Sequence, residues 1–483
     1  MIDLSPTIKE VSQLSRPLIV AWVVAFAEGF STLAVEVIAI RLAVPVVGSS
    51  IVLTGVMLGV VLLALSVGYW RGGALSANWT PQQTRRALSR NLLIAAVLYG
   101  AVVFPLEAMA LAQFLDWELP LTLSIGLAAS ILLLPPLYLA SQTVPMLAEL
   151  TNIDGHAGRA SGRILFFSTI GSVAGGVVTP VWLFPTLGVA RTGLVVCAML
   201  VVAAVGMALE KRATMLGGAA ALALIAGATA LAAPRHELFY FDSEYQTIQV
   251  VERPKGDRVE RVMMMSGGRA SGVYADTGQT SFAYAHAIFE ALQQSRADSL
   301  LVIGAAGFNV PRDAVALPYM KTIDAVDVDP AVKPISETYF LRQPLPGIIR
   351  FFPLSARHAA RKFGRERRRY GLTVLDAYFG QGIPEELVTL EFFEDVHRVS
   401  DRTLANLITD RDLDSEFSHN FLATFRQAFG AVWIVDVAPG DSYFANLLIS
   451  NWPVSGATLW NEQGTAYRDD KNHAAWEFVR MKW

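Results

Sequence analysis

Cysteine is almost absent from this chain of 483 residues. The single cysteine, Cys197, lies within an apolar run. One cysteine can form neither an intramolecular disulfide nor a cysteine metal cluster, so cysteine usage does not indicate a redox compartment. The histidines of the second half are scattered without the spacing of metal ligands. They are His286, His358, His397, His419 and His473. We therefore expect no metal site.

Charged residues are also scarce. They make up 17% of the chain, whereas 53% of the residues are hydrophobic. This composition is too apolar for an ordinary soluble protein, so we expect part of the chain to lie in a membrane. The net charge of -3 argues against general nucleic-acid binding. Most charges follow residue 234, which predicts two domains with different solvent preferences.

Seven apolar runs before residue 234 are long enough to cross a bilayer, which takes about 20 helical residues. They are residues 18–47, 51–70, 92–115, 119–147, 164–187, 192–209 and 215–233. We interpret residues 1–233 as a helical membrane domain with about seven spans. The fifth run carries small residues, which permit close contact between helices. They are Ser168, Gly171, Ser172, Gly175 and Gly176.

The first run contains Glu28, Glu36 and Arg41. Charges inside hydrocarbon are costly, so they normally pair or line a polar cavity. The favoured interpretation is a structural pair of Glu36 with Arg41, or an Arg41 that extends to the membrane interface. The alternative is a role in transport or proton relay. The nearest further acid is Glu107, and no later run carries a matching charge at mid-membrane, which weakens this alternative.

Lysine and arginine gather in alternate connections between the runs, after the second, fourth and sixth. They are Arg71, Arg85, Arg86, Arg90, Arg159, Arg163, Lys211 and Arg212. The positive-inside rule places these connections in the cytoplasm. With seven spans, residues 234–483 would then lie outside the cytoplasm, which conflicts with the use of a cytosolic nucleoside. The side of the membrane on which these residues lie stays open.

Residues 234–483 show strands that alternate with helices. Two β-rich runs, residues 240–251 and 258–265, predict a hairpin, and residues 282–293 predict a helix. Four buried strands follow, at residues 300–303, 323–327, 348–352 and 372–376. The pattern predicts a β-hairpin with a connecting helix over residues 234–298. It also predicts a Rossmann-like, doubly wound α/β domain over residues 299–483, with a mostly parallel sheet covered on both faces.

A nucleoside-sized crevice is expected at the carboxyl ends of these strands. Gly304 and Gly307 follow the first strand, and Asp327 and Asp329 end the second about twenty residues later. Glycines let the backbone approach a ligand, while a carboxylate at the tip of the second strand accepts hydrogen bonds from ribose hydroxyls. Asp376 falls at the same edge. A tight turn in an ordinary parallel sheet is the alternative interpretation of the glycines, and a turn-capping aspartate that of Asp376.

Several short motifs occur in an order that resembles the spermidine synthase family. They are Ser243–Gln246, Ser266–Gly268, Tyr284, the glycine turn, residues 326–329, residues 375–378 with Ile383-Pro384, and Glu391-Phe-Phe. The membrane half is similar to the membrane-fused branch of that family. Its motifs are Glu36 with Arg41, the Leu-Leu-Pro-Pro stretch, and residues 162–176. The resemblance covers nearly the whole chain.

The resemblance implies transfer of an aminopropyl group from decarboxylated S-adenosylmethionine, or a related nucleoside, to a small amine such as putrescine. It implies Asp376 and Tyr284 as catalytic residues and no metal. The donor-binding residues it implies are Tyr245, Gln246, Gly304, Gly307, Asp327 and Asp329. It further implies a class I methyltransferase type for the Rossmann-like domain of residues 299–483. Together with the seven apolar runs, it predicts a multi-pass protein in contact with membrane lipid, in a bacterial inner membrane. The net charge predicts no nucleic-acid partner. A homodimer and a larger membrane complex are both open.

Departures from the family pattern define a second hypothesis. Phe308 is bulky where the backbone should stay open, and Thr280-Ser281 replace an acidic pair that would hold a diamine. Ser355 and Phe379 stand where two further carboxylates are usual. Each charge-assisted contact is worth roughly 1.5–3 kcal/mol, so putrescine would be held weakly. The alternative to an enzyme is a non-catalytic subunit or scaffold of a membrane complex.

Overall fold

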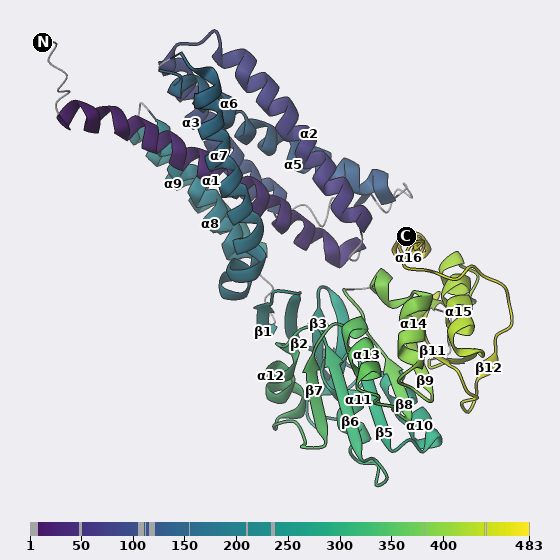
Figure 1. Ribbon diagram of the computed structural model, residues 1–483. Coiled ribbons are helices and arrows are strands. Elements are labelled where there is room, and N and C mark those ends of the chain that lie inside the picture. The colour runs from purple at the N-terminus through teal and green to yellow at the C-terminus, as the bar shows by residue number, and fades with distance from the viewer. Residues whose placement is uncertain are drawn as a thin grey trace, which may run out of the picture. The chain divides into compact units, whose positions relative to one another are not determined.

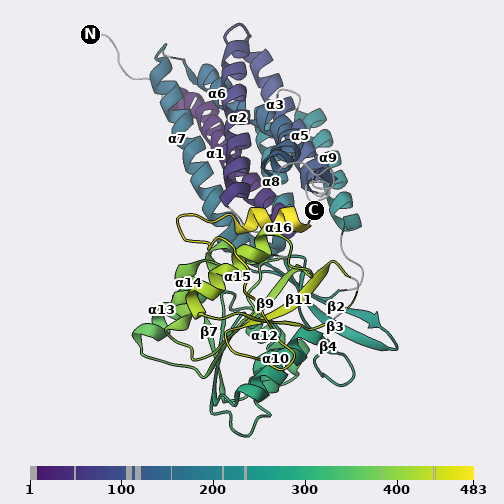
Figure 2. The ribbon, with the colours of Figure 1, turned by 90° about the vertical axis from the view of Figure 1, so that its right-hand side faces the viewer.

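The protein forms two compact units in a computed structural model. The structure describes residues 8–47, 51–104, 111, 113–114, 121–153, 155–208, 211–232, 237–380, 382–438, 440 and 442–482. Unit 1 comprises residues 1–43 and 51–234, and unit 2 comprises residues 44–50 and 235–483. Figures 1 and 2 show that unit 1 consists of helices and unit 2 of sheets with flanking helices.

Unit 1 is a bundle in which α2 lies alongside α5, and α3 alongside α8 (Figures 1 and 2). The α-helices are α1 (Ile8–Val47), α2 (Ile51–Ser76), α3 (Pro81–Leu98), α5 (Leu121–Ser141), α6 (Thr143–Thr151), α7 (Ala157–Val178), α8 (Phe184–Met207) and α9 (Lys211–Ala232). Short π-helical turns, η1 (Tyr99–Val103) and η2 (Thr179–Leu183), extend α3 and join α7 to α8. Many large apolar side chains on these helices, such as Phe166 and Trp182, are exposed, as expected of helices that face lipid.

Five helices of the described residues have the length and apolar composition to cross a membrane. They are Leu18–Val47, Ile51–Ser76, Pro81–Val103, Thr122–Thr151 and Ala157–Met207. The last has 51 residues, about twice what one crossing needs. It is interrupted at Gly188, whose φ of 79° and ψ of 166° are not helical. Length and apolar composition show that a helix could cross a membrane, not that it does so. The count of about seven spans therefore stays a prediction.

The small residues of α7 pack closely against α1, as predicted. A Cβ atom on Gly171 would lie 2.2 Å from the Phe26 carbonyl oxygen, and one on Gly175 would lie 2.2 Å from that of Phe30. The Ser168 hydroxyl donates to Glu28 Oε2 at 3.1 Å across the same interface. Glu28 is therefore satisfied by hydrogen bonds within the bundle.

The second polar position of α1 holds Glu36 and Arg41. Glu36 is buried, and the Arg41 guanidinium lies 5.7 Å from the centre of the Phe184 ring. Among the described residues, no ion pair joins Glu36 to Arg41. The structure therefore gives no support to the membrane polar pair, which stays a prediction.

Unit 2 begins with a four-stranded antiparallel sheet in the order β1-β2-β3-β4. The strands are β1 (Glu237–Asp242), β2 (Thr247–Lys255), β3 (Arg258–Met265) and β4 (Gly268–Tyr274). The predicted hairpin corresponds to β2 and β3, which turn at Gly256-Asp257. The hairpin prediction was too small, because β1 and β4 add a strand at each edge.

The larger sheet has eight strands in the order β12-β10-β11-β9-β8-β5-β6-β7. They are β5 (Ser299–Ile303), β6 (Thr322–Asp327), β7 (Ile349–Pro353), β8 (Leu372–Leu375), β9 (Thr403–Asp410), β10 (Trp433–Asp436), β11 (Phe444–Ser450) and β12 (Thr458–Leu459). Strands β5 to β9 pair in parallel, whereas β11 is antiparallel to both β9 and β10. The expected mostly parallel sheet is thus mixed, because β10 returns through a hairpin loop into β11.

Helices cover both faces of the larger sheet, as predicted (Figures 1 and 2). Alternate residues of β5 enter different cores: Leu301 and Ile303 join one, and Leu300 and Val302 the other. The helices are α10 (Ala283–Ser295), α11 (Asn309–Ala314), α12 (Val332–Ser336), α13 (Ala356–Arg365), α14 (Leu390–His397), α15 (Glu416–Phe429) and α16 (Ala474–Lys482), with the short turns η3 (Glu337–Leu341) and η4 (Glu385–Leu387). This arrangement directs the carboxyl ends of the parallel strands toward one edge, where a ligand site is expected.

Candidate active site

A cavity of about 1230 Å³ lies at the carboxyl ends of the parallel strands of unit 2. Its wall contains Gly304 after β5, Asp327 at the end of β6 and Asp376 after β8. Residues of the four-stranded sheet and of its β1–β2 turn, which carries Gln246, close another side. Pockets for small molecules usually measure about 300–1,000 Å³, so this space can hold a nucleoside and a second small molecule.

Gly304 fits the backbone tightly at this edge. Its φ of 96° is unfavourable for a residue with a side chain, and a Cβ atom there would lie 2.1 Å from the Asp376 carbonyl oxygen. Gly307 faces β4 instead: its amide donates to Ser271 Oγ at 3.0 Å. The cavity wall formed by the described residues includes Gly304 but not Gly307. The second glycine therefore serves packing between the loop and the small sheet.

Phe308 does not obstruct the cavity. Its side chain is fully buried and packs edge-on against Phe351, with ring centres 5.4 Å apart. The bulky residue of the glycine loop therefore points into the core beneath the sheet. This departure from the family pattern leaves the crevice open.

Asp327 holds the glycine loop. Its Oδ2 accepts from the amides of Ala305 and Ala306 at 3.1 and 3.2 Å, and its Oδ1 accepts from Asp329 N at 3.0 Å. Burial raises the pKa of Asp327 to about 6; these backbone hydrogen bonds lower it, and the charge of Asp329 raises it further. Oδ1 retains one lone pair, so Asp327 can accept from one hydroxyl of a ligand in the cavity.

Asp329 lies outside the cavity wall that the described residues form. Its Oδ1 accepts from Ala331 N at 2.9 Å and its Oδ2 accepts from Ser243 Oγ at 2.5 Å. The Ser243 hydroxyl also accepts from the backbone N–H of Gln246 at 2.9 Å. Asp329 therefore joins the β1–β2 turn to the end of β6. Contact between Asp329 and a donor stays a prediction without support from this placement.

Tyr245 and Gln246 both line the cavity. Tyr245 is 39% exposed, whereas Gln246 is 2% exposed and buried at the wall. Among the described residues, Gln246 Oε1 has no hydrogen-bond partner. An unsatisfied buried polar atom is costly, so its position at a cavity wall is typical of a ligand contact.

Asp376 and Tyr284 meet in the cavity wall. Asp376 Oδ1 accepts from Asn406 Nδ2 at 2.8 Å, and the Tyr284 hydroxyl donates to the Ala270 carbonyl at 3.1 Å. Burial raises the pKa of Asp376 to about 7, against the lowering effect of Asn406 and Tyr284. Burial and the Asp376 charge raise the pKa of Tyr284 well above its ordinary value, so its phenol stays protonated. A carboxylate with a pKa near neutrality suits proton transfer.

Asn406 and Asn446 were missed by the sequence analysis. Asn446 Nδ2 donates to Asn406 Oδ1 at 3.1 Å, which leaves the Asn406 amide nitrogen directed at Asp376. The two residues lie on the adjacent strands β9 and β11. A polar amide within an apolar strand is unusual. That signal was present in the sequence around each residue.

The residues that replace family carboxylates lie in two places. Ser355 and Phe379 line the cavity, so the wall is less acidic at these points. Thr280 and Ser281 are buried outside the wall that the described residues form, where their hydroxyls donate to Asp313 Oδ2 and Glu260 Oε1 at 2.7 Å each. The expected loss of diamine-binding groups stays a prediction.

The strand order and the cavity at the carboxyl ends define unit 2 as a Rossmann-like domain of methyltransferase type. No model of a known protein family matches the chain. A polyamine aminopropyltransferase of Vibrio vulnificus (strain CMCP6) is 31% identical over 133 residues, which are 28% of this chain and 44% of that protein. The chain thus matches less than half the length of this curated relative. The predicted resemblance to the spermidine synthase family is confirmed over this segment.

Three solved structures are also similar. A probable spermidine synthase from Corynebacterium glutamicum ATCC 13032 is 19% identical, with a TM-score of 0.37 over 45% of this chain and 80% of that one. A spermidine synthase in complex with the transition state analogue AdoDATO is 15% identical, with a TM-score of 0.38 over 50% and 85%. Spermidine synthase from Thermotoga maritima is 14% identical, with a TM-score of 0.37 over 50% and 84%. Because these TM-scores are below 0.5, the family resemblance depends on the sequence similarity alone.

Proposed function

We propose that this protein is a membrane-integrated, spermidine synthase-like transferase. It transfers an aminopropyl group from a decarboxylated S-adenosylmethionine-type donor to an amine. The observation that carries the proposal is the position of Asp376, a carboxylate with a pKa of about 7, in the wall of a nucleoside-sized cavity. The five long apolar helices support integration into a membrane.

The donor side of the cavity has groups that suit a nucleoside. Asp327 offers one free acceptor position for a ribose hydroxyl, and Gln246 offers an unsatisfied amide oxygen. Gly304 keeps the loop after β5 close to the residues after β8. These groups bind and orient the donor so that its sulfonium faces Asp376.

The chemical step requires a neutral amine beside the donor. The amine lone pair forms a bond to the carbon next to sulfur, and the carbon–sulfur bond breaks with its electron pair passing to sulfur. The products are the alkylated amine and methylthioadenosine, and the amine proton passes to the Asp376 carboxylate. Tyr284 stays protonated, so its role is to position the carboxylate and not to act as a base.

Calorimetry on the full chain in detergent tests the proposal. Methylthioadenosine and decarboxylated S-adenosylmethionine should both bind, and methylthioadenosine should be released when an amine is added to the bound donor. If neither nucleoside gives a heat of binding, the proposal is overturned. It would favour the alternative function, a non-catalytic subunit or scaffold of a membrane complex, which the replacement of acids by Ser355 and Phe379 supports.

A further inference from the structure

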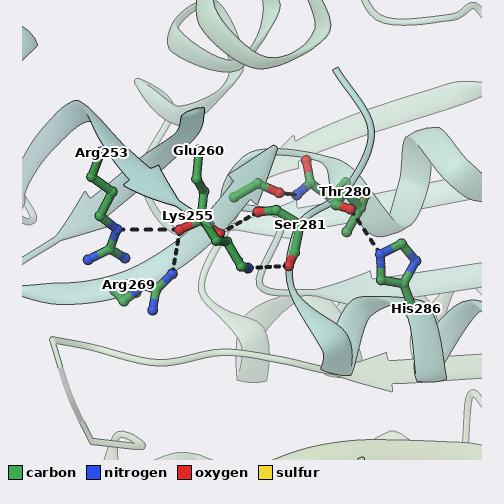
Figure 3. Close-up of polar contacts among 9 residues, drawn as sticks. Arg253, Lys255, Glu260, Arg269, Thr280, Ser281 and His286 are labelled. Atoms are coloured by element: carbon green, nitrogen blue, oxygen red, sulfur yellow. Dashed lines mark hydrogen bonds and ion pairs between the residues drawn. The ribbon is translucent and has the colours of Figure 1, made fainter. Parts of the chain in front are cut away.

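Three cations surround one buried carboxylate in the four-stranded sheet (Figure 3). Glu260, whose side chain is 2% exposed, lies 3.3 Å from Arg253 Nε, 2.9 Å from Lys255 Nζ and 2.8 Å from Arg269 Nη2. Ser281 Oγ also donates to Glu260 at 2.7 Å. We name Arg253, Lys255, Glu260 and Arg269 the basic cluster.

Strand geometry produces the basic cluster. Arg253 and Lys255 are two apart on β2, so they share one face of the sheet, and Glu260 on β3 is the direct cross-strand partner of Arg253. Arg269 follows on β4, the next strand. A single carboxylate therefore serves three cations, which leaves the cluster with an excess of positive charge.

The excess charge faces the cavity. Arg253, Lys255 and Arg269 line its wall, whereas Glu260 does not. Burial and the nearby charge of Arg253 lower the pKa of Arg269, and the charge of Glu260 opposes this shift. Like charges held together in this way favour a bound anion.

One atom of the cluster lacks a partner. Arg253 Nη2 is buried and, among the described residues, has no hydrogen bond. A buried guanidinium donor normally meets a carboxylate or a phosphate. The unpaired donor is an observation independent of the charge excess, and it too indicates an anionic ligand.

The basic cluster also lies beside the reacting groups. Arg269 is flanked by Ala270, whose carbonyl accepts from Tyr284, and by Gly268, whose Cβ position would lie 1.9 Å from the Gly380 carbonyl oxygen. Tyr284 in turn contacts Asp376. Arg269, Tyr284 and Asp376 all line the cavity, so a ligand group held by Arg269 shares this space with the amine that Asp376 would deprotonate.

We infer that the substrate in this part of the cavity carries a carboxylate, bound by Arg253, Lys255 and Arg269. The inference rests on the proposed function and specifies its substrate class. A diamine such as putrescine presents a second cation to this cluster and is disfavoured. The carboxylate belongs either to an amino-acid-type acceptor, which agrees with the decarboxylated donor of the proposed function, or to a donor that keeps its methionine carboxylate. In the second case the group transferred is aminocarboxypropyl in place of aminopropyl, and both sources present the same chemistry to the cluster.

Paired ligands test the inference by calorimetry on the full chain in detergent. The acceptor pair is 4-aminobutyrate and 1,4-diaminobutane, and the donor pair is S-adenosylmethionine and its decarboxylated form. In at least one pair the carboxylate member should bind about tenfold tighter or more, as expected for one lost charge-assisted contact. Equal binding within both pairs, or tighter binding of the ligand without the carboxylate, would overturn the inference.

Variants locate the effect. Arg253→Gln and Arg269→Gln should each abolish the preference for a carboxylate. Each variant retains two of the three ion pairs to Glu260, so folding is expected to persist. Arg261→Gln is the matched control, because Arg261 lies on β3, pairs with Glu252 and does not line the cavity. Arg253→Lys keeps the charge and should keep most of the preference. A preference that survives both glutamine variants contradicts the assignment.

Methylthioadenosine, which has neither a carboxylate nor an aminopropyl group, separates the two proposals. If it binds and the carboxylate preference is absent, the inference fails and the proposed function stands. If it does not bind, the proposed function fails, and the acceptor pair measured without nucleoside still decides whether the cluster prefers a carboxylate.

Discussion

The side-chain amide of Asn406 donates to the Asp376 carboxylate at 2.8 Å, and Asn446 fixes the orientation of that amide from the neighbouring strand. This relationship holds the part-buried carboxylate of Asp376 in the cavity wall, where its pKa is about 7. Burial raises the pKa of Asp376, and the hydrogen bond from the Asn406 amide opposes this rise. The acid–base behaviour of Asp376 is therefore expected to depend on two asparagines, Asn406 on β9 and Asn446 on β11.

Asp376→Asn should reduce turnover about 10²–10⁴-fold while methylthioadenosine binding stays nearly unchanged, because the variant removes only the proton acceptor. Single-turnover assays and calorimetry measure the two quantities. Asp276→Asn is the control, since Asp276 is exposed in the turn after β4 and pairs with Arg258. Equal loss of binding and turnover, or loss of folding alone, would show that Asp376 is structural.

The wild-type rate should rise as pH increases through about 7, because Asp376 must be ionised to accept a proton. Asn406→Ala removes a donor to the ionised carboxylate, so it should move this limb to higher pH. Profiles of kcat/KM against pH for the two proteins measure the shift. An unchanged limb in Asn406→Ala would mean that another group controls it.

Asp376 should also make stability depend on pH. Its pKa is about 7 in the folded chain and 3.8 when exposed, so the folded state binds this proton more tightly than the unfolded state does. The contribution of Asp376 to stability therefore decreases as the pH rises from about 4 through about 7. As pH rises to about 8, the folded state retains an ionised buried carboxylate at a cost of up to ~4 kcal/mol, reduced by solvent that reaches the cavity. Asp376→Asn should therefore have a higher Tm than the wild type at pH 8. Thermal melts should show this difference disappearing toward pH 4.

Asp327→Ala should affect both binding and folding. The variant leaves three backbone N–H groups without their acceptor, and each unsatisfied buried group costs roughly 1–3 kcal/mol. Asp327→Asn keeps acceptor oxygen at one position and should be milder. Thermal melts and methylthioadenosine titrations measure the two effects. A stable Asp327→Ala variant with normal nucleoside affinity would contradict both roles.

Gly171→Val should loosen the helix pair α1–α7. A Cβ atom at Gly171 would lie 2.2 Å from the Phe26 carbonyl oxygen, and overpacking of this kind typically costs about 1–3 kcal/mol. Gly176→Val is the matched control, because its Cβ position is 4.0 Å from the nearest atom, on Leu33. Thermal melts in detergent should show a lower Tm for Gly171→Val only. Equal effects would mean that the close approach does not contribute to stability.

Local patterns sufficed to predict the strands β5 to β8 and the glycine loop, because apolar runs with turn residues are encoded by neighbours in sequence. No strand after residue 376 was predicted, so β9 to β12 were missed, and the place of β11 between β9 and β10 depends on long-range pairing. For the same reason Asn446 was not linked to Asn406, 40 residues away. The carboxylate of Asp327 was expected to bind ribose, yet its backbone contacts depend on loop geometry that spacing does not specify.

The basic cluster was not predicted for a similar reason. Arg253, Lys255 and Arg269 look like ordinary surface charges in the sequence, and only the pairing of three strands gathers them around Glu260. Phe308 was taken as an obstacle because its side-chain direction could not be known from its position in the loop. Its positive φ of 58° turns the side chain into the core.

The hydrogen bond between Ser243 and Asp329 has a kinetic consequence. It joins the turn that carries Tyr245 and Gln246 to the end of the strand that carries Asp327, so hydrogen bonds hold the groups that would contact a donor in place relative to one another. A site assembled before the ligand arrives loses little conformational entropy on binding. Association of a nucleoside should therefore follow a single exponential whose rate increases linearly with concentration, without the plateau that a slow rearrangement produces.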